Sequence, residues 1–486
     1  MSNFYGLELA SKSLYASQKA IETTAHNIAN VNTEGYSRQV VELEAVVNYN
    51  GLIYDSKNAR NVGSGVVISN IEQVRNEFYD KLYRKEISIS SELTSKNQAY
   101  SYIEEIMKSS SDSNITNDIT SLFNSMEKLS LDSENMILRE QVRQDAILLT
   151  DNLNTTAENL YQFQSQLNNN VIALTGQIND MANEVASLND MIYKYELSGN
   201  KANDLRDQRN LLVDQISEKI GVTTSEGADG TFKVLINGFS LVDHKTVNQI
   251  TLKQDITNPV TNEKYSSLYW GSTNTKVNIQ SGEMKALTDM RDGNSVDRIG
   301  VNYIIGKLDN LAGSLVTEFN AINRAGYTLP YGSSSSETGI DFFNAANTHA
   351  FNISISSELE ESGANIAASS QLISDFSNWG NNENLQSFMN LRESDSITFG
   401  SESIGDFESY IENTYTQISF ATGFAASRKA SQDSIVSYVT NQKDSVSGVN
   451  LDEEMLNLSR YQKSYQAAAK LMAVIDEMLQ TLLNSF

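Results

Sequence analysis

The sequence predicts a mainly α fold with β inserts, in which helices at the two ends of the chain pair as a coiled-coil core domain. Three observations support this prediction. The chain of 486 residues contains only two prolines, Pro259 and Pro330, and proline is the residue that breaks helices most strongly. Heptad repeats of apolar residues occupy both ends of the chain. A long segment in the first half also repeats with helical spacing.

Near the N-terminus, large apolar residues fall seven apart, and mostly smaller residues follow three positions later. The first row is Leu7, Leu14, Ile21 and Ile28, and the second is Ala10, Ser17, Thr24 and Val31. The C-terminal segment repeats the arrangement with Leu451, Leu458, Tyr465, Met472, Leu479 and Phe486, followed by Tyr461, Ala468, Ile475 and Leu482. Glu454 interrupts the second row. Such paired rows form the apolar seam of a coiled coil.

Neither terminal helix has a neighbour in sequence that could cover its seam, and an isolated helix of ~30 residues is marginal in water. The simplest arrangement pairs the first helix with the last, or packs both between subunits, so we expect these seams to order on assembly. The alternative is an ordinary domain whose termini meet in a shared core. The predicted assembly interface consists of Leu7, Leu14, Ile21, Ile28, Leu451, Leu458, Tyr465, Met472, Ile475, Leu479 and Leu482.

The middle of the first half predicts a rod. Apolar residues from Leu153 to Tyr195 recur at spacings of mostly four and three, which corresponds to a helix ~65 Å long. Gly199 and Asn200 end this helix, and a second one runs from 204 to 219. Further helices are predicted over 74–107, 115–131, 284–323 and 406–446.

Two segments interrupt the helical pattern. Residues 222–279 contain short alternating apolar runs, and Asn237-Gly238 between two of them indicates a β-hairpin. Residues 331–399 contain a glycine followed by four serines at 332–336, include the strand-like run 351–355, and are otherwise loop-like.

These patterns divide the chain into four predicted regions. They are a terminal coiled-coil axial domain (1–50 with 449–486), a long-helix rod domain (51–220 with 281–330 and 400–448), an outer β-rich insert (221–280) and an irregular or β insert (331–399).

Composition excludes several classes of function. The chain has 36 Lys and Arg against 61 Asp and Glu, a net charge of -25, and no basic block, so we expect no binding to nucleic acid or anionic membranes. No stretch has the ~18 consecutive apolar residues of a membrane helix, and the first residues lack a secretory signal pattern. The absence of cysteine excludes disulfides, zinc-thiolate sites and thiol nucleophiles.

No catalytic, cofactor-binding or metal-binding residues are predicted, and we expect that the protein is not an enzyme. His26, His244 and His349 are far apart in sequence and have no acidic or histidine partner three or four residues further along the chain. His26 is expected to be exposed or to make a polar interface contact. The acidic run 452–454 is explained as the first turn of a helix, with Asn450 as N-cap and Glu453 closing a capping box.

One run of residues resembles a known family. Residues 27–39 read Asn-Ile-Ala-Asn-Val-Asn-Thr-Glu-Gly-Tyr-Ser-Arg-Gln, which is similar to the N-terminal signature of the bacterial flagellar axial proteins, namely rod, hook and hook-associated proteins. Physically, the run ends a helix, and Gly35 is expected to take a positive φ. The family signature consists of Asn27, Asn30, Thr33, Gly35 and Tyr36.

Within that family, the ending 36–39 resembles the hook-associated proteins. The segments 203–214 and 448–468 are similar to an internal helix and the C-terminal helix of the same group. Gln73 and Asn76 depart from its pattern, because the resemblance leads us to expect an arginine and an aspartate there. The similarity is strong over about 90 terminal residues and the helix at 203–214, moderate over the other helices, and mostly positional over the two inserts.

The resemblance implies a structural subunit that polymerises at the distal end of the hook, where it joins hook and filament. It implies type III export from the cytoplasm to the extracellular flagellum without a cofactor. The implied partners are copies of itself, the hook protein, a second junction protein and a cytoplasmic export chaperone, which would bind Leu458, Tyr465 and Met472. A hook or distal rod protein is the alternative. A flagellin-like subunit would lack the signature run, and an enzyme would need a catalytic insert.

Overall fold

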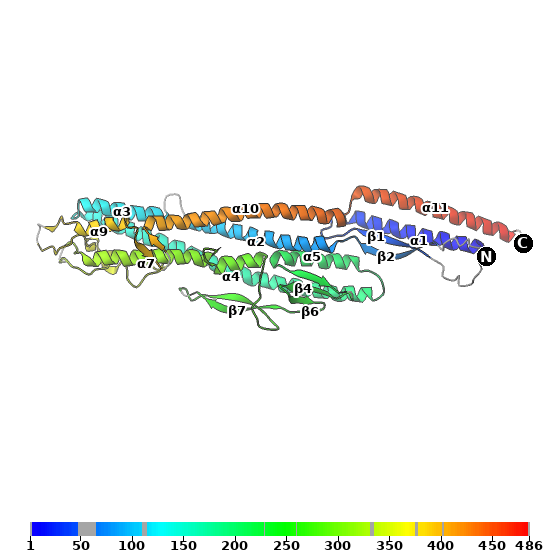
Figure 1. Cartoon of the computed structure of the whole chain (residues 1–486), viewed down its shortest axis with the longest axis horizontal. Helices are drawn as coiled ribbons and strands as arrows, with labels where there is room; N and C mark the ends of the chain where they lie inside the picture. The colour runs from blue at the N-terminus through cyan, green and yellow to red at the C-terminus, as the bar shows by residue number, and fades with distance from the viewer. Residues whose placement is uncertain are drawn as a thin grey trace.

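The computed structural model is an elongated bundle of helices with both chain termini at one end (Figure 1). It describes residues 2–46, 65–108, 114–227, 229–258, 260–330, 335–374, 378–400 and 403–484. The predicted class, mainly α with β inserts, is confirmed. The division into four domains stays a prediction.

Eleven α-helices and one short 3-10 helix are described. The helices are α1 (Ser2–Ala29), α2 (Glu77–Lys108), α3 (Ile115–Leu131), α4 (Met136–Glu196), α5 (Asn203–Lys219), α6 (Glu283–Asp292), α7 (Val301–Ala325), α8 (Ser357–Glu361), η1 (Gly363–Asn365), α9 (Glu383–Arg392), α10 (Phe407–Ser447) and α11 (Leu451–Asn484).

The strands in the described part of the chain form small antiparallel sheets. They are β1 (Gln39–Ala45), β2 (Val66–Gln73), β3 (Thr223–Glu226), β4 (Phe232–Ile236), β5 (Phe239–Asp243), β6 (Thr246–Val247), β7 (Ile250–Thr257), β8 (Lys264–Trp270), β9 (Asn294–Ser295), β10 (Arg298–Ile299), β11 (Ile397–Phe399) and β12 (Ser403–Gly405).

The rod is built around α4, whose 61 residues correspond to ~92 Å of helix. It begins 17 residues before the predicted start at Leu153, because Val142, Ala146 and Leu149 continue the same buried spacing. Asn135 caps its first turn by accepting from the Ile137 amide at 3.0 Å. Helix α10 packs along α2 on the other side of the rod (Figure 1).

The predicted single helix over 284–323 is wrong. Helix α6 ends at Asp292, and the β9–β10 hairpin separates it from α7. Gly293 and Gly300 close this hairpin against the end of α6. A Cβ on Gly293 would lie 2.6 Å from the Asp289 carbonyl oxygen, and one on Gly300 would lie 2.7 Å from that of Met290.

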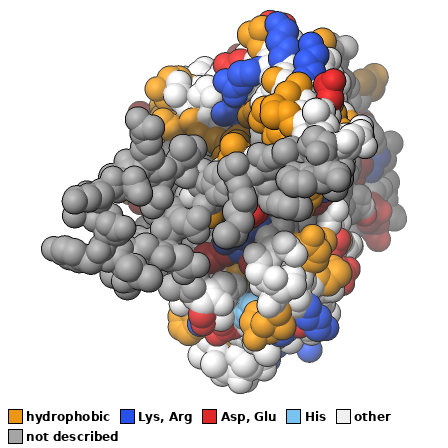
Figure 2. All heavy atoms as spheres, turned by 90° about the vertical axis from the view of Figure 1, so that its right-hand side faces the viewer, with side chains coloured by type: hydrophobic (Ala, Val, Ile, Leu, Met, Phe, Trp, Pro, Cys, Tyr) orange, Lys and Arg blue, Asp and Glu red, His pale blue; other side chains and the backbone are white. Residues whose placement is uncertain are grey.

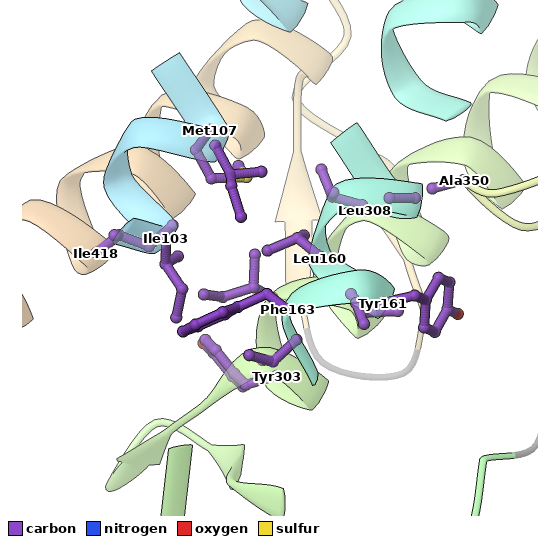
Figure 3. Close-up of a cluster of buried hydrophobic side chains, with 14 of the residues drawn as sticks. Ile103, Met107, Leu160, Tyr161, Phe163, Tyr303, Leu308, Ala350 and Ile418 are labelled. Carbon is purple, nitrogen blue, oxygen red and sulfur yellow. The ribbon is translucent and has the colours of Figure 1, made fainter. Parts of the chain in front are cut away.

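The rod core joins residues far apart in the sequence. Figure 3 shows side chains from four long helices meeting in one cluster. They include Ile103 and Met107 of α2, Leu160 and Phe163 of α4, Tyr303 and Leu308 of α7, and Ile418 of α10. Because every one of these helices contributes to the same apolar core, the central part of the rod folds as one packed body.

The segment 222–279 is β-rich, as predicted. Strands β3 to β6 form one antiparallel sheet, and Asn237 and Gly238 both have positive φ, 46° and 85°, in the hairpin turn between β4 and β5. The neighbouring β7–β8 pair is fastened to α4. Asn179 donates to the Ile250 carbonyl oxygen at 2.8 Å and accepts from its amide at 2.9 Å.

The segment 331–399 is largely irregular, as predicted, but it also contains the unpredicted helices α8 and α9 and packs into one end of the rod. Phe319 of α7 is surrounded by rings from this segment and its neighbours, with centroids 5.3 Å from Phe342 and Phe388 and 5.4 Å from Phe343. The predicted strand over 351–355 is wrong, since only Ile355 makes an isolated bridge, to Phe343. Residues 331–334, including part of the serine run, lie outside the described residues.

Candidate assembly interface

The terminal helices α1 and α11 pack side by side at the end of the molecule that holds both termini (Figure 1). Small residues make the close contact. Ala10, Ser17 and Thr24 of α1 are at most 6% exposed, and a Cβ on Gly6 would lie only 3.2 Å from Ile475 of α11. The small second row of the N-terminal heptads thus lets the two helices approach closely.

The residues of the predicted assembly interface are distributed around this contact. Ile475 is buried, whereas Leu451 and Tyr465 are 46% and 40% exposed. The side chain of Leu482 lies outside the described residues. The half-buried members are Leu7, Leu14, Ile21, Ile28, Leu458, Met472 and Leu479.

Further apolar side chains of these helices face solvent in the single chain. Figure 2 looks onto this end of the molecule and shows hydrophobic side chains at its surface. On α11 they form a second stripe, at spacings of three and four, that the heptad analysis missed. Leu471, Val474 and Met478 are 46%, 47% and 52% exposed, and Leu456 is 71% exposed. The pair therefore retains an apolar surface that the described part of the chain does not cover.

The signature run forms a turn built around Asn27, which is 1% exposed. Its side-chain amide donates to the Gln39 carbonyl oxygen at 2.9 Å and to the Glu454 carboxylate at 3.1 Å. Its side-chain oxygen, Oδ1, accepts from the Tyr36 hydroxyl at 2.7 Å and from the Gln39 backbone amide at 3.0 Å. One buried side chain thus closes the turn and connects it to α11.

Glu454, which interrupts the C-terminal heptad row, is 3% exposed because it faces Asn27. Asn450 caps α11 as predicted, accepting from the Asp452 amide at 3.0 Å. Glu453 differs from the prediction, because its carboxylate pairs with Arg38 at 3.1 Å rather than closing a capping box. The acidic run therefore connects α11 to the signature turn as well as starting the helix.

The other signature residues support the same turn. Burial and nearby carboxylates raise the pKa of Tyr36, which keeps its hydroxyl protonated as a donor. Gly35 has a φ of 76°, as predicted. Thr33 donates to Asn30 at 3.1 Å. His26 is exposed and lies 3.0 Å from the Tyr36 hydroxyl, which makes it a polar contact of the turn.

A charged network fastens the signature turn to the rod. Ser37 donates to Asp207 of α5 through its amide at 3.0 Å and its hydroxyl at 2.7 Å. Arg75 donates to Asp207 at 3.1 Å and pairs with Asp80 at 2.9 Å. Burial raises the pKa of Asp207, while the bonds from Ser37 and Arg75 oppose this shift.

The network continues to the end of α10. Asp214 accepts from Arg84 of α2 at 2.6 Å and from Lys443 of α10 at 2.7 Å. Burial would raise the pKa of Asp214, but the charges of Arg84 and Lys443 overcome this effect and lower it. Lys443 also lies over the Tyr83 ring, 4.3 Å from its centroid. A cleft of about 780 Å³ opens beside these residues, between the signature turn, α5 and α10.

Sequence reasoning missed this network. The sequence did indicate its acidic members, since Asp207 and Asp214 lie in the family-like segment 203–214. Their arginine partners could not be identified, because Gln73 and Asn76 occupy the positions where the family pattern predicts charged residues. The structure has an arginine–aspartate pair nearby instead, Arg75 with Asp80.

Within the described residues, no three His, Cys, Asp or Glu side chains are grouped so as to hold a metal ion. No helix in the same part of the chain is long and apolar enough to cross a membrane. The ordered polar groups near the terminal helices are engaged in fastening elements to one another.

Comparisons with known families agree at three places along the chain. Residues 100–343 match the flagellar hook-associated protein FlgK helical domain. Residues 442–485 match the flagellar basal body rod FlgEFG protein C-terminal family, and residues 7–36 match the flagella basal body rod protein family. The two rod-type matches thus fall on the terminal segments that contain α1 and α11.

Curated relatives match over nearly the whole chain. Flagellar hook-associated protein 1 of Bacillus subtilis (strain 168) is 28% identical over 516 residues, covering 99% of this chain and 98% of the relative. The protein of the same name from Escherichia coli (strain K12) is 23% identical, with 98% of both chains covered. Among solved structures, the flagellar hook junction protein FlgK from Burkholderia pseudomallei aligns with a TM-score of 0.60. It is 14% identical and covers 75% of this chain and 100% of its own, so it shows a shared fold.

Proposed function

The chain belongs to the flagellar hook-associated protein 1 (FlgK) family, and from this membership we propose that it joins the hook to the filament. It is a structural protein of the bacterial flagellum. In this proposal the subunit polymerises at the distal end of the hook after export by the flagellar type III apparatus. A chain with no cysteine and two prolines suits export in an unfolded state, because no disulfide can resist unfolding.

The observation that carries this proposal is the apolar surface left on the paired terminal helices. Leu456, Leu471, Val474 and Met478 of α11 are each about half exposed or more. Fully burying such a side chain contributes ~1.5 to 3 kcal/mol, so completing the burial of each contributes roughly 1 kcal/mol. Burial of the half-buried heptad residues adds to this gain. The total offsets the conformational entropy that the helices lose on ordering only when neighbouring subunits cover them. Assembly and ordering of the termini would then be one event.

The proposed arrangement follows from the position of these helices. The α1–α11 pairs of successive subunits would line the central channel, in a ring or helical turn. The rod would contact the hook protein on one side and the second junction protein on the other. The β-rich insert would face outward, where an insertion disturbs the assembly least.

Before export, we propose that the heptad row of α11, rather than its second stripe, lies in the groove of a cytoplasmic chaperone. An amphipathic helix laid in an apolar groove is a common recognition mode. The chaperone contacts would be Leu458, Tyr465 and Met472. Leu458→Asp and Met472→Asp should each weaken chaperone capture in a pull-down, whereas Lys470→Asp, an exposed change of charge on the same helix, should not. Equal capture of all four proteins would refute this contact.

The alternative, a hook or distal rod protein, shares the terminal helices. The length of the chain argues against a rod protein, and its long central helices argue against a hook protein, whose outer part we expect to be mostly β. The 61 residues of α4 support the junction role on the same grounds.

Deletion of the gene tests the proposal. We expect intact hooks, no attached filaments and unpolymerised flagellin in the medium, all restored by the wild-type gene. Missing hooks would instead indicate a hook or rod component. Attached filaments of normal length would refute a junction role.

A further inference from the structure

We propose that the outer face of α10 is a docking surface for a second copy of this chain, which binds it through an acidic side of its rod. This inference rests on the proposed polymerisation and assigns a lateral contact to it. We call the surface the α10 stripe, and it consists of Phe420, Phe424, Ile435 and Tyr438. These side chains are 74%, 55%, 45% and 64% exposed.

The α10 stripe is not needed to fold the chain. The opposite face of α10 is buried against the rod through Ile411, Ile418, Ala425 and Val439. The stripe residues lie on one face at spacings of 4, 11 and 3, and they span ~27 Å of helix. A helix in a soluble protein normally has a polar outer face, so an apolar stripe opposite the core indicates a second partner. In Figure 1, α10 runs along one edge of the rod.

Charge indicates which partner fits. Residues 413–443 contain one acidic residue and three basic residues, of which Lys443 is bound to Asp214 in the rod, whereas the rest of the chain has 33 basic and 60 acidic residues. The one acid, Asp433, already pairs with Lys429. Arg428 has no carboxylate partner within the described residues, and it lies over the Phe424 ring, 5.7 Å from its centroid. Another copy therefore presents an acidic surface to the least acidic stretch of this one.

The same charges favour a head-to-tail contact. A two-fold pairing of one stripe with another would bring two copies of Arg428 together, and like charges across an interface are unfavourable. A stripe that meets a different surface on the next copy generates a ring or a helix instead of a closed dimer. This geometry matches a subunit that forms a ring or a helical turn.

The size of the stripe explains when it would act. Aromatic side chains bury ~150–250 Å² each, so covering the exposed parts of the four residues removes roughly 400–500 Å² from solvent on this side. A stable complex needs ~800 Å² per partner. The stripe is thus too small to hold a dimer alone, and it would add to contacts between terminal helices. Phe and Arg are among the residue types enriched in the cores of such contacts.

Photo-cross-linking in assembled flagella tests the docking. Phe420→p-benzoylphenylalanine and Ser431→p-benzoylphenylalanine place the probe on the stripe, and Leu131→p-benzoylphenylalanine, at a position 85% exposed, is the control. We expect dimers of this chain from the two stripe probes at more than ten times the control yield, with cross-linked peptides from outside α10 of the partner copy. Cross-links to another flagellar protein, between two copies of α10, or none at all would overturn the proposal.

A complementation assay separates this inference from the proposed function. In the deletion strain, Phe420→Ser combined with Phe424→Ser should lower the number of attached filaments at least tenfold. Its thermal unfolding should match that of the wild type, because both rings are exposed. If the wild-type gene restores filaments and the double variant restores them equally, the docking surface is wrong while the junction role stands. If the deletion leaves filaments attached, the junction role itself fails.

Discussion

Asp214 gives the sharpest test of how the rod is held together next to the signature turn. Its carboxylate is 11% exposed and accepts from Arg84 at 2.6 Å and from Lys443 at 2.7 Å. Asp214→Asn keeps the shape but leaves two cations facing a neutral amide. Removing one partner of a buried ion pair costs ~3–5 kcal/mol. We expect the lower end, about 3 kcal/mol, because Arg84 keeps bonds to Asn210 and Thr224.

The stability difference between wild type and Asp214→Asn should depend on pH, in a direction set by the pKa of Asp214. The pKa of Asp214 in the folded protein lies below its usual value. A carboxylate with a lowered pKa stabilises the fold fully above its unfolded pKa of ~3.9, and this stabilisation disappears as the pH falls through the folded pKa. The difference between wild type and Asp214→Asn should therefore be full at pH 7 and shrink below about pH 4.

Urea denaturation followed by far-UV circular dichroism measures this difference in the free energy of unfolding. Asp433→Asn is the matched control, because its carboxylate pairs with Lys429 at a position 43% exposed. Such surface pairs contribute ~1 kcal/mol or less. Asp214 would not have this stabilising role if Asp214→Asn lowered the free energy of unfolding no more than the control does. The same would follow if its effect were equal at pH 7 and pH 3.

Three further predictions concern the turn, the core and the termini. Asn27→Ala leaves several buried groups without a hydrogen bond, and each such loss costs ~1–3 kcal/mol. In complementation of the deletion strain, Asn27→Ala should abolish filament attachment, whereas Asn32→Ala, at an exposed position, should not. Full attachment with Asn27→Ala would contradict this. Phe319→Ala should lower the free energy of unfolding by ~3–5 kcal/mol in urea, and a loss below about 1 kcal/mol would show that the aromatic cluster does not carry this end of the rod. In the unassembled protein, deletion of 1–30 and 450–486 should remove almost no helical circular dichroism; loss of the signal of about 65 helical residues would show that the termini are ordered before assembly.

Much of the architecture follows from sequence patterns, because apolar spacing reports what each helix buries. The rows at 7–28 and 451–479 predicted the terminal helices, and the pairing of Asn237 with Gly238 predicted the hairpin. The early start of α4 was also encoded, since Val142, Ala146 and Leu149 extend its spacing. The break between α6 and α7 was indicated by two glycines seven apart, but a helical pattern on both sides hid it.

The polar connections could not be predicted in the same way. Asn27 and Glu454 are 427 positions apart, and their meeting depends on the register between the first and last helices. That register cannot be predicted from a single sequence. For the same reason, Glu454 could be read only as a break in a heptad row until its partner was known.

Immunogold electron microscopy of intact flagella shows whether the protein lies between the hook and the filament. Antibodies raised against the β-rich segment 222–279 should label a single narrow band between the hook and the filament, and no label should appear in the deletion strain. Label distributed along the hook, along the filament or within the basal body would contradict a position at the junction.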